Sequence, residues 1–414
     1  MKVNVNWNGN RNVNQDCFQY PLISIGIIGG GQLGRMMVQK AKKMGFYVTI
    51  LDPTPDSPAA QVADEQILGD FYDANKLREL VKKSEVTTYD IEHTNTEVLK
   101  ELVNEVPGNT IYPSPYLLEI IQDKFKQKDT LSRSGIPVPK YEKVEESDGD
   151  GQLLYPDNLR FPCVQKARKG GYDGRGVIVL KDKNDLENCA NAITITADSD
   201  SFIEEFIDFE KELAVIVARN PGGEVRTYPV VEMVFDERAN ICDMVIAPAR
   251  IEEEIAEQAK EIAVKSIEIL DGVGVFGVEM FLTADGRVLV NEIAPRPHNS
   301  GHYTIEACVT CQFEQHIRAI SGLPLGSTEL LSPAVMINLL GCEGYAGRPL
   351  IEGVYKAHSI PGLSFHLYGK ARTRPFRKMG HVTILDLDEN LEETIEKAKA
   401  VKKFLKVKAE EDNI

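Results

Sequence analysis

The sequence predicts an α/β protein whose N-terminal part is a doubly wound parallel sheet. Residues 22–30 form a short apolar run that ends in glycine, as buried parallel strands often do. Two more strand-like runs, at 47–51 and 85–91, are separated by stretches with helical periodicity. Because strand–helix–strand repeats pair their strands in parallel, this order predicts a sheet with its ligand site at the carboxyl ends of the strands.

The length of the chain and the order of its expected elements predict several domains. With 414 residues it exceeds what one hydrophobic core normally serves, so two or three domains are expected. The asparagine-rich first residues lack an apolar segment, which favours a mobile tail over a secretory signal. A small β-rich domain should close the chain, with strands near 334–340, 354–357, 364–367 and 380–385 and a helix from 390. The expected divisions are residues 1–20, 21–115, 116–328 and 329–414.

Composition excludes several classes of partner. The net charge of -16 argues against nonspecific binding to nucleic acid or to an anionic membrane surface. No apolar run approaches the roughly 18 residues of a membrane span. Cys308 and Cys311 fall within a helix expected at 303–320, and reduced thiols of a cytoplasmic protein explain them better than a metal or redox site. Another helix is expected at 116–134.

A pair of carboxylates carries the strongest chemical signal. Glu279 and Glu292 lie in two apolar runs joined by a turn that contains Asp285 and Gly286, a pattern typical of a β-hairpin. The hairpin would place both acids on one side of a sheet, where they suit Mg²⁺ shared with substrate phosphates. The loop that follows the second strand is polar and basic, and would suit a small anion beside the metal: Arg296, His298 and Asn299.

Glycine-rich loops mark two further candidate sites. Residues 29–34 (GGGQLG) follow a strand and open a helix, whose N-terminus offers N–H groups to an anion. Asp52 closes the next strand, where a dinucleotide enzyme would hold ribose hydroxyls, so an NAD-dependent oxidoreductase is a competing interpretation. Residues 170–176 (GGYDGRG) lie between two strands and, with Lys166, Lys169 and Arg175, could close over a triphosphate.

Two charged segments complete the candidate site. The acidic segment around 204–212 suits adenosine, with strand backbone for the adenine and a carboxylate for the sugar hydroxyls, although a solvated acidic edge explains it equally well. A basic cluster at 370–378 interrupts an acidic chain and favours a phosphate site, since Arg supplies bidentate contacts and Lys a point charge.

Taken together, these motifs resemble the ATP-grasp superfamily and, within it, the PurK family. The resemblance covers about residues 22–390 and rests on GGGQLGRM (29–36), YDIEHT (89–94), KGGYDGRG (169–176), FGVEM (276–280), NEIAPRPHNSGH (291–302) and GKARTRPFRKMGH (369–381). It implies ATP-grasp architecture between the N-terminal parallel sheet and the small C-terminal domain. It also implies ATP- and bicarbonate-dependent carboxylation of the exocyclic amine of 5-aminoimidazole ribonucleotide in purine biosynthesis, through carboxyphosphate, with either carboxyphosphate or the CO₂ that it releases as the carboxylating species. The products would be 5-(carboxyamino)imidazole ribonucleotide, ADP and phosphate.

The resemblance also assigns roles to residues. Mg²⁺, or Mn²⁺ in its place, would be held by Glu279 and Glu292. The nucleotide contacts would be Lys124, Lys166, Gly170, Gly171, Tyr172, Asp173, Gly174, Arg175, Gly176, Glu204, Glu205, Phe206, Ile207, Glu212, Asn291 and Glu292. The imidazole ribonucleotide would meet Gln32, Leu33, Glu92, Tyr172, Asp173, Lys370, Arg377 and Lys378. The residues expected to take part in catalysis are Asp173, Arg296, His298, Asn299 and Lys370.

The chain departs from the family pattern at Lys124 and at Phe235, and alternatives to the PurK family remain. Family members often carry Arg where Lys124 stands, and some carry His where Phe235 stands. A homodimer is expected, and a separate mutase would take the product. Besides the oxidoreductase, the alternatives are another ATP-grasp enzyme of the purine pathway, such as a formate-dependent glycinamide ribonucleotide transformylase, and a noncatalytic nucleotide-binding subunit.

Overall fold

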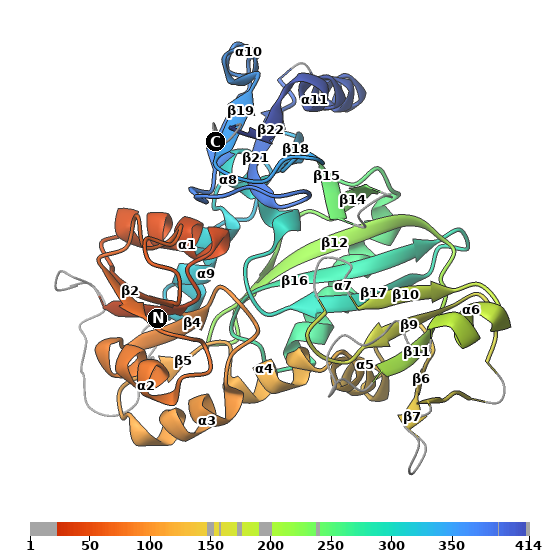
Figure 1. Cartoon of the computed structure of the whole chain (residues 1–414), viewed down its shortest axis with the longest axis horizontal. Helices are drawn as coiled ribbons and strands as arrows, with labels where there is room; N and C mark the ends of the chain where they lie inside the picture. The colour runs from red at the N-terminus through yellow and green to blue at the C-terminus, as the bar shows by residue number, and fades with distance from the viewer. Residues whose placement is uncertain are drawn as a thin grey trace.

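The computed structural model describes residues 23–146, 153–156, 159–171, 176–189, 201–236, 241–387 and 389–410. The expected tail at 1–20 lies outside the described residues, as do Tyr172, Asp173, Gly174 and Arg175 of the second glycine-rich loop. Figure 1 shows the N-terminal sheet, the central sheets and the C-terminal elements arranged around a common centre. Within the described ranges, no helix is long and apolar enough to cross a membrane.

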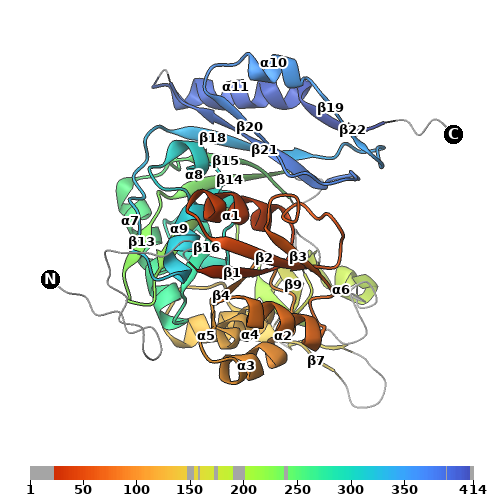
Figure 2. The ribbon, with the colours of Figure 1, turned by 90° about the vertical axis from the view of Figure 1, so that its left-hand side faces the viewer.

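The N-terminal part is the predicted doubly wound parallel sheet. Its strands run in the order β3-β2-β1-β4-β5 and all pair in parallel. They are β1 (Ser24–Ile28), β2 (Tyr47–Asp52), β3 (Glu65–Leu68), β4 (Val86–Tyr89) and β5 (Thr110–Ile111). Helix α1 (Gln32–Lys43) packs on one face, and α2 (Ala74–Lys83) and α3 (Thr96–Glu105) pack on the other (Figure 2). Strand β3 was not expected, because its sequence EQIL carries little apolar signal.

The helix expected at 116–134 is two helices, α4 (Pro115–Gln122) and α5 (Lys124–Arg133). Asp123 lies between them in extended conformation and its Oδ1 accepts hydrogen bonds from the N–H groups of Phe125 and Lys126. A carboxylate in this position satisfies donors that a helix start leaves open, so α5 begins anew at Asp123. The break aims the first residue of α5, Lys124, towards the central sheets.

Two antiparallel sheets form the centre of the molecule. The smaller has the order β10-β9-β11-β6 and is flanked by α6 (Lys183–Cys189); its strands are β6 (Tyr141–Lys143), β9 (Cys163–Ala167), β10 (Val177–Leu180) and β11 (Ser201–Glu205). Strands β7 (Glu145–Glu146) and β8 (Leu153–Leu154) pair beside it. The larger sheet has the order β17-β16-β12-β14-β15-β18-β21-β20, and β13 (Val225–Thr227) pairs with β12.

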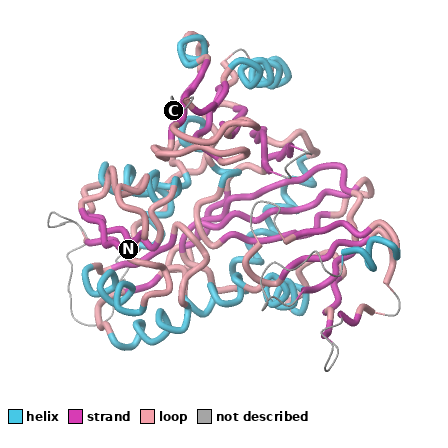
Figure 3. The backbone as a smooth tube through the Cα atoms, in the orientation of Figure 1, coloured by secondary structure: helices cyan, strands magenta, loops and turns pink. Residues whose placement is uncertain are grey.

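The larger sheet crosses the expected boundary at residue 329. The strands that precede this boundary are β12 (Phe209–Arg219), β14 (Val231–Asp236), β15 (Ile241–Ala247), β16 (Gly274–Thr283) and β17 (Val288–Ala294). Three strands from the C-terminal part continue it without interruption: β18 (Ala334–Leu340), β20 (Leu363–Leu367) and β21 (Lys378–Leu385). The join is β15 with β18, from Met244 opposite Ile337 to Ala247 opposite Ala334. The magenta strands of Figure 3 show this continuity.

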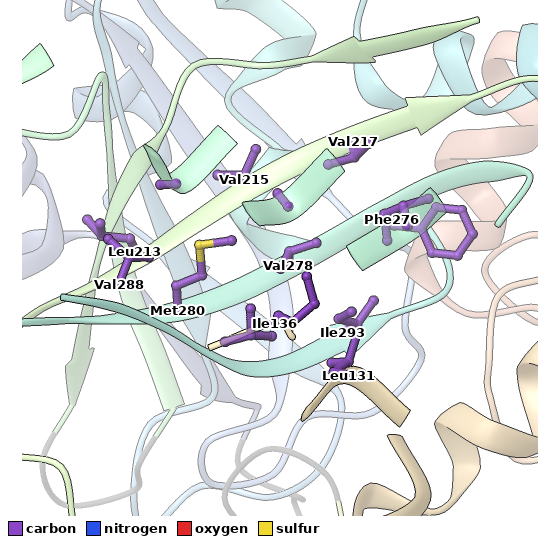
Figure 4. Packing of buried hydrophobic residues seen from close by; sticks show 14 of the residues in the cluster. Leu131, Ile136, Leu213, Val215, Val217, Phe276, Val278, Met280, Val288 and Ile293 are labelled. Atoms are coloured by element: carbon purple, nitrogen blue, oxygen red, sulfur yellow. The ribbon is translucent and has the colours of Figure 1, made fainter. Parts of the chain in front are cut away.

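The central core lies on one face of the larger sheet. Alternate residues of β12 and β16 point into it, as strand periodicity requires. Figure 4 shows Leu213 and Val215 beside Val278 and Met280, with Leu131 of α5 below them. Helix α7 (Glu253–Ile269) covers the same cluster through Ala259, Ala263 and Ile267. This core fixes the hairpin of β16 and β17 against α5.

The C-terminal elements bear out most of the sequence expectations. Helix α11 (Leu391–Phe404) is present, and β19 (Pro349–Glu352) pairs with β22 (Lys406–Ala409). The strand expected at 354–357 is wrong: the segment is a short helix, α10 (Val354–His358), which follows Gly353 at a φ of 82°. The helix expected at 303–320 is also wrong in its continuity, because α8 (Thr304–Ala307) and α9 (Gln312–Ile320) are separate. Cys308 and Cys311 flank the break, and burial raises the pKa of both thiols.

Candidate functional site

A cavity of about 790 Å³ lies where the N-terminal sheet, the two central sheets and strand β21 meet. It brings together predicted site residues from segments far apart in the sequence. Those that line it are Gln32, Leu33, Glu92, Lys124, Lys166, Gly170, Gly171, Glu204, Glu205, Phe206, Ile207, Glu212, Glu279, Asn291, Glu292, Arg296, His298, Asn299 and Lys378. Gly176, Lys370 and Arg377 are described but do not line it.

The predicted carboxylate pair is formed by the β16–β17 hairpin. Glu279 and Glu292 are cross-strand partners, and the register slips by one residue just beyond them, so that Met280 lies opposite Val290. Asn291 is the extra residue of this bulge. A bulge of this kind lets two successive side chains face the same way, which explains why both Asn291 and Glu292 line the cavity.

The electrostatics of the pair favour a cation. Burial, with the charges of Glu292 and Glu212 adding to it, raises the pKa of Glu279 to about 8. Lys124, whose Nζ lies 2.5 Å from Oε2 of Glu292, holds the pKa of that carboxyl well below its usual range. Glu279 is therefore a buried carboxylate whose charge needs further compensation.

The donor set fits Mg²⁺. Two carboxylates on adjacent strands, with the bulge residue Asn291 beside them, offer hard oxygen atoms of the kind this ion prefers. In the described part of the chain, no group of three or more His, Cys, Asp or Glu side chains is arranged to hold a metal. The protein would thus supply only part of the coordination shell, as is usual where nucleotide phosphates and water complete it.

A buried ionic network lies on the side of the cavity formed by the smaller sheet and helix α5. Glu204 is 2% exposed, and the Nζ atoms of Lys128 and Lys166 each lie 2.7 Å from one of its oxygens. Lys166 also donates to Oδ1 of Asn291 at 3.0 Å, which links the smaller sheet to the hairpin. Burial raises the pKa of Glu204, but the two lysines outweigh it and the pKa is lowered. The carboxylate of Glu204 is therefore engaged by cations, and the sugar hydroxyls that we assigned to this segment would fall to Glu212, whose pKa burial raises to about 7.

Sequence reasoning missed Lys128, Asp123 and Arg168. The guanidinium of Arg168 pairs with Asp123, its Nη2 lying 2.6 Å from Oδ2, while the backbone N–H of Lys124 donates to the carbonyl of Arg168 at 2.8 Å. These contacts tie the start of α5 to the end of β9. Lys128 follows Lys124 by one helical turn, and this spacing was a usable signal that both face the same way.

The loop after β17 brings Arg296, His298 and Asn299 to the cavity. Nε2 of His298 lies 3.2 Å from Oε1 of Glu279, and its Nδ1 lies 2.9 Å from Oγ of Ser300. Burial, and then the positive charges of Arg296 and Lys378, lower the pKa of His298 to about 4, so the imidazole is neutral at neutral pH. Nη2 of Arg296 lies 2.6 Å from Oε1 of Glu92, which joins this loop to the N-terminal sheet.

Two N–H groups of the first glycine-rich loop are engaged by carboxylates of the same sheet. The N–H of Gly30 donates to Oδ2 of Asp52 at 2.8 Å, and the N–H of Gly31 donates to Oδ2 of Asp90. A Cβ on Gly31 would lie 2.6 Å from the same Asp90 oxygen, so the glycine permits this close approach. Carboxylates therefore occupy the N–H groups of Gly30 and Gly31, the two residues that precede helix α1. Asp52, where the competing oxidoreductase interpretation would hold ribose hydroxyls, accepts from backbone N–H groups through both oxygens, Oδ2 from Gly30 and Oδ1 from Thr54.

The basic cluster is divided between the cavity and its surroundings. Lys378 lines the cavity. Lys370 donates from Nζ to the carbonyl of Lys378 at 2.7 Å and lies over the ring of Tyr368, while Arg377 donates to the carbonyl of Arg372. Lys370 thus supports the backbone that carries Lys378.

The fold and the site together define an ATP-grasp enzyme: two antiparallel sheets hold between them a cavity with buried lysines and a carboxylate hairpin. Three family models match the chain. An ATP-grasp domain matches residues 129–313, a ribonucleotide synthetase preATP-grasp domain matches 22–122, and a phosphoribosylaminoimidazole carboxylase C-terminal domain matches 334–397.

Similar proteins narrow the class. N5-carboxyaminoimidazole ribonucleotide synthase of Bacillus subtilis is 41% identical over 371 residues, covering 90% of this chain and 93% of that protein. Phosphoribosylaminoimidazole carboxylase of Candida albicans is 42% identical over 369 residues, 87% of this chain but only 64% of that protein's length. The N5-carboxyaminoimidazole ribonucleotide synthetase structure from Thermotoga maritima is 58% identical with a TM-score of 0.83, over 94% of this chain and 100% of that one.

A solved relative also carries ligands. The Aspergillus clavatus N5-carboxyaminoimidazole synthase, in complex with ADP and 5-aminoimidazole ribonucleotide, is 35% identical with a TM-score of 0.81, over 92% of this chain and 98% of that one. The chain belongs to the N5-carboxyaminoimidazole ribonucleotide synthase (PurK) family of ATP-grasp ligases.

Proposed function

We propose that this chain carboxylates the exocyclic amine of 5-aminoimidazole ribonucleotide at the expense of ATP and bicarbonate. The observation that carries the proposal is the single cavity shared by the ATP-grasp sheets and the N-terminal sheet, since it can hold a nucleotide, a metal and a small ribonucleotide together. The complex of the Aspergillus clavatus relative with ADP and 5-aminoimidazole ribonucleotide supports the same pair of ligands. The products would be 5-(carboxyamino)imidazole ribonucleotide, ADP and phosphate.

The proposed reaction has two steps. An oxygen of bicarbonate attacks the γ-phosphorus of ATP, the bond to the β-phosphate oxygen breaks, and carboxyphosphate and ADP form. The amine nitrogen then bonds to the carboxyl carbon, the phosphate leaves, and the amine loses a proton. Phosphoryl transfer depends mainly on positioning and charge neutralisation, which the lysines and the cation site supply.

The residues would divide the work by position. Lys124, Lys166 and the backbone at 170–176 would hold phosphates, and the strand residues at 204–207 with Glu212 would hold adenosine. Glu279 and Glu292 would hold Mg²⁺, or Mn²⁺ in its place, which when bound neutralises charge on the phosphates. Arg296, His298 and Asn299 would orient bicarbonate. Gln32, Leu33, Glu92 and Lys378, with the loop residues Tyr172 and Asp173, would face the ribonucleotide.

In its neutral state His298 carries one N–H, which is on Nε2 because Nδ1 accepts from the N–H of Ser300. This N–H lies beside Oε1 of Glu279, so His298 would meet bicarbonate next to the proposed cation site. Lys370 and Arg377 would act on the ribonucleotide phosphate by shaping the segment that carries Lys378. A homodimer, a cytoplasmic location and a separate mutase that takes the product are also part of the proposal.

The test is ADP release by purified protein with Mg-ATP and bicarbonate, with and without 5-aminoimidazole ribonucleotide. We expect strong stimulation by the ribonucleotide, with loss of its free amine. Stimulation by formate and glycinamide ribonucleotide instead would keep the fold and overturn the substrate. ADP release under neither condition would favour a noncatalytic nucleotide-binding protein.

A further inference from the structure

Two buried carboxamides, neither of which lines the cavity, hold the segment that would meet bicarbonate. Asn338 comes from β18, at the junction with the C-terminal part (Figure 1), and Gln312 is the first residue of α9. Asn338 is 3% exposed and Gln312 is 0% exposed. Each makes several hydrogen bonds to residues of the loop after β17.

Asn338 and Asn299 form a reciprocal amide pair. Nδ2 of Asn299 donates to Oδ1 of Asn338 at 2.9 Å, and Nδ2 of Asn338 donates to Oδ1 of Asn299 at 2.7 Å. Nδ2 of Asn338 also donates to the backbone carbonyl of Cys242 at 2.8 Å. A carbonyl can only accept, so this third bond fixes which end of Asn338 is nitrogen, and the pairing then fixes Asn299.

This pairing leaves a specific group for the cavity. The amide nitrogen of Asn299 has two hydrogens, of which one goes to Asn338. The other has no partner among the hydrogen bonds of the described residues, and Asn299 lines the cavity. Asn299 is therefore held as a donor rather than an acceptor towards that side, as an anion requires.

Gln312 holds the backbone of His298, the residue before Asn299, through its side-chain amide. Its Oε1 accepts from the backbone N–H of His298 at 2.9 Å, and its Nε2 donates to the backbone carbonyl of His298 at 2.8 Å. The same Nε2 lies 3.0 Å from Nδ1 of His302. A Cβ on Gly301 would lie 2.5 Å from Oε1 of Gln312, so the loop passes this side chain with no spare room.

We propose that Asn338 and Gln312 are positioning residues for bicarbonate: Asn338 holds the amide of Asn299 as an oriented donor, and Gln312 holds the backbone of His298 in place. The inference rests on the proposed function and deepens it. Neither residue touches the reacting atoms. Their effect is preorganisation: donors already aligned in the free enzyme need not be ordered when the anion binds. Loss of the hydrogen bonds from either Asn338 or Gln312 should weaken bicarbonate binding and leave ATP binding nearly unchanged.

The test compares Asn338→Leu and Gln312→Met with Thr383→Val as matched control. Thr383 is fully buried on β21, and its hydroxyl has no described hydrogen-bond partner. Thr383→Val therefore changes the same sheet but leaves the hydrogen bonds of Asn338 and Gln312 in place. Initial rates of ADP release are measured in carbonate-depleted buffer at saturating ribonucleotide, varying bicarbonate and ATP in turn. We expect the KM for bicarbonate to rise about tenfold in Asn338→Leu and in Gln312→Met, while their KM for ATP stays within about twofold of the wild-type value. Both KM values should be unchanged in Thr383→Val.

The outcomes separate the inference from the proposed function. If the wild-type protein showed no bicarbonate-dependent ADP release, the proposed function itself would be refuted. An active wild type with a normal bicarbonate KM in folded Asn338→Leu, or with the KM for ATP raised equally, would overturn the inference alone. Asn338→Ser, which removes the pairing without placing an apolar side chain against the amide of Asn299, replaces Asn338→Leu if that variant does not fold. If the serine variant also failed to fold, Asn338 would be a stability residue and the inference would be overturned.

Discussion

Lys128 allows the energetics of the buried ionic network to be measured directly. Burial lowers its pKa from 10.5 to about 8, against the attraction of Glu204. At about 1.4 kcal/mol per pKa unit, the cost of keeping the ammonium charged in the folded protein is about 3 kcal/mol. The shifted group therefore predicts how stability changes with pH. Lys128→Met removes that group while keeping a long apolar stem.

The sign follows from proton binding. Between about pH 8 and 10.5 the unfolded chain keeps the Lys128 proton, whereas the folded protein has lost it, so stability rises with pH in this window. Below about pH 8 both states are protonated and the full cost is present. We therefore expect the wild type to gain about 3 kcal/mol relative to Lys128→Met between pH 7 and pH 10.5. Titrations of groups remote from Lys128 are common to both proteins and cancel in the difference.

Glu204→Gln supplies the contrast at pH 7. Lys128→Met leaves Glu204 and Lys166 as a balanced pair and should cost no more than about 1 kcal/mol. Glu204→Gln leaves two buried cations together and should cost about 3–5 kcal/mol. Urea unfolding followed by circular dichroism measures both values. A difference from wild type that stays flat from pH 7 to 10.5, or equal costs for the two variants, would refute the reasoning.

Three further changes test other contacts. Glu292→Gln should bind nucleotide but lose about a hundredfold in turnover, because a carboxylate of the cation site is neutralised; calorimetric nucleotide binding with near-normal ADP release would count against that assignment. Glu92→Gln breaks the 2.6 Å pair with Arg296 and should raise bicarbonate-dependent ADP release severalfold in the absence of ribonucleotide, and an unchanged background would contradict this. Asp123→Ala removes both the α5 cap and the Arg168 pair and should cost about 3–5 kcal/mol in urea unfolding, whereas Asp123→Asn, which keeps the cap, should cost less.

The strands and the hairpin were predictable because their signals are local. Strands β1 and β18 are short, nearly continuous apolar runs. Strands β16 and β17 are also apolar runs, and the turn at Asp285 and Gly286 joins them. The breaks at Asp123 and between Cys308 and Cys311 were missed because apolar periodicity continues across them. At 354–357 the residues Val354 and Tyr355 favour a strand, but the left-handed Gly353 turns the chain into a short helix.

The site was predictable as a set of residues but not as a set of pairings. The carboxylates Glu279 and Glu292 could be placed together because one hairpin carries both. The partnership of Lys128 with Glu204 depends on how α5 packs on the smaller sheet, which no local pattern encodes. In the same way, the glycine pattern at 29–34 predicts available N–H groups, but only the fold shows that Asp52 and Asp90 accept from them.

The continuity of the larger sheet has a consequence for any attempt to separate its parts. A shortened chain that stopped near residue 329 would strip β18 from β15 and leave the N–H and C=O groups of a buried, apolar strand open to solvent. Exposed edges of that kind recruit strands from other molecules, so such a fragment should aggregate rather than behave as a compact catalytic half. The same ladder should make the central and C-terminal parts melt as one cooperative unit.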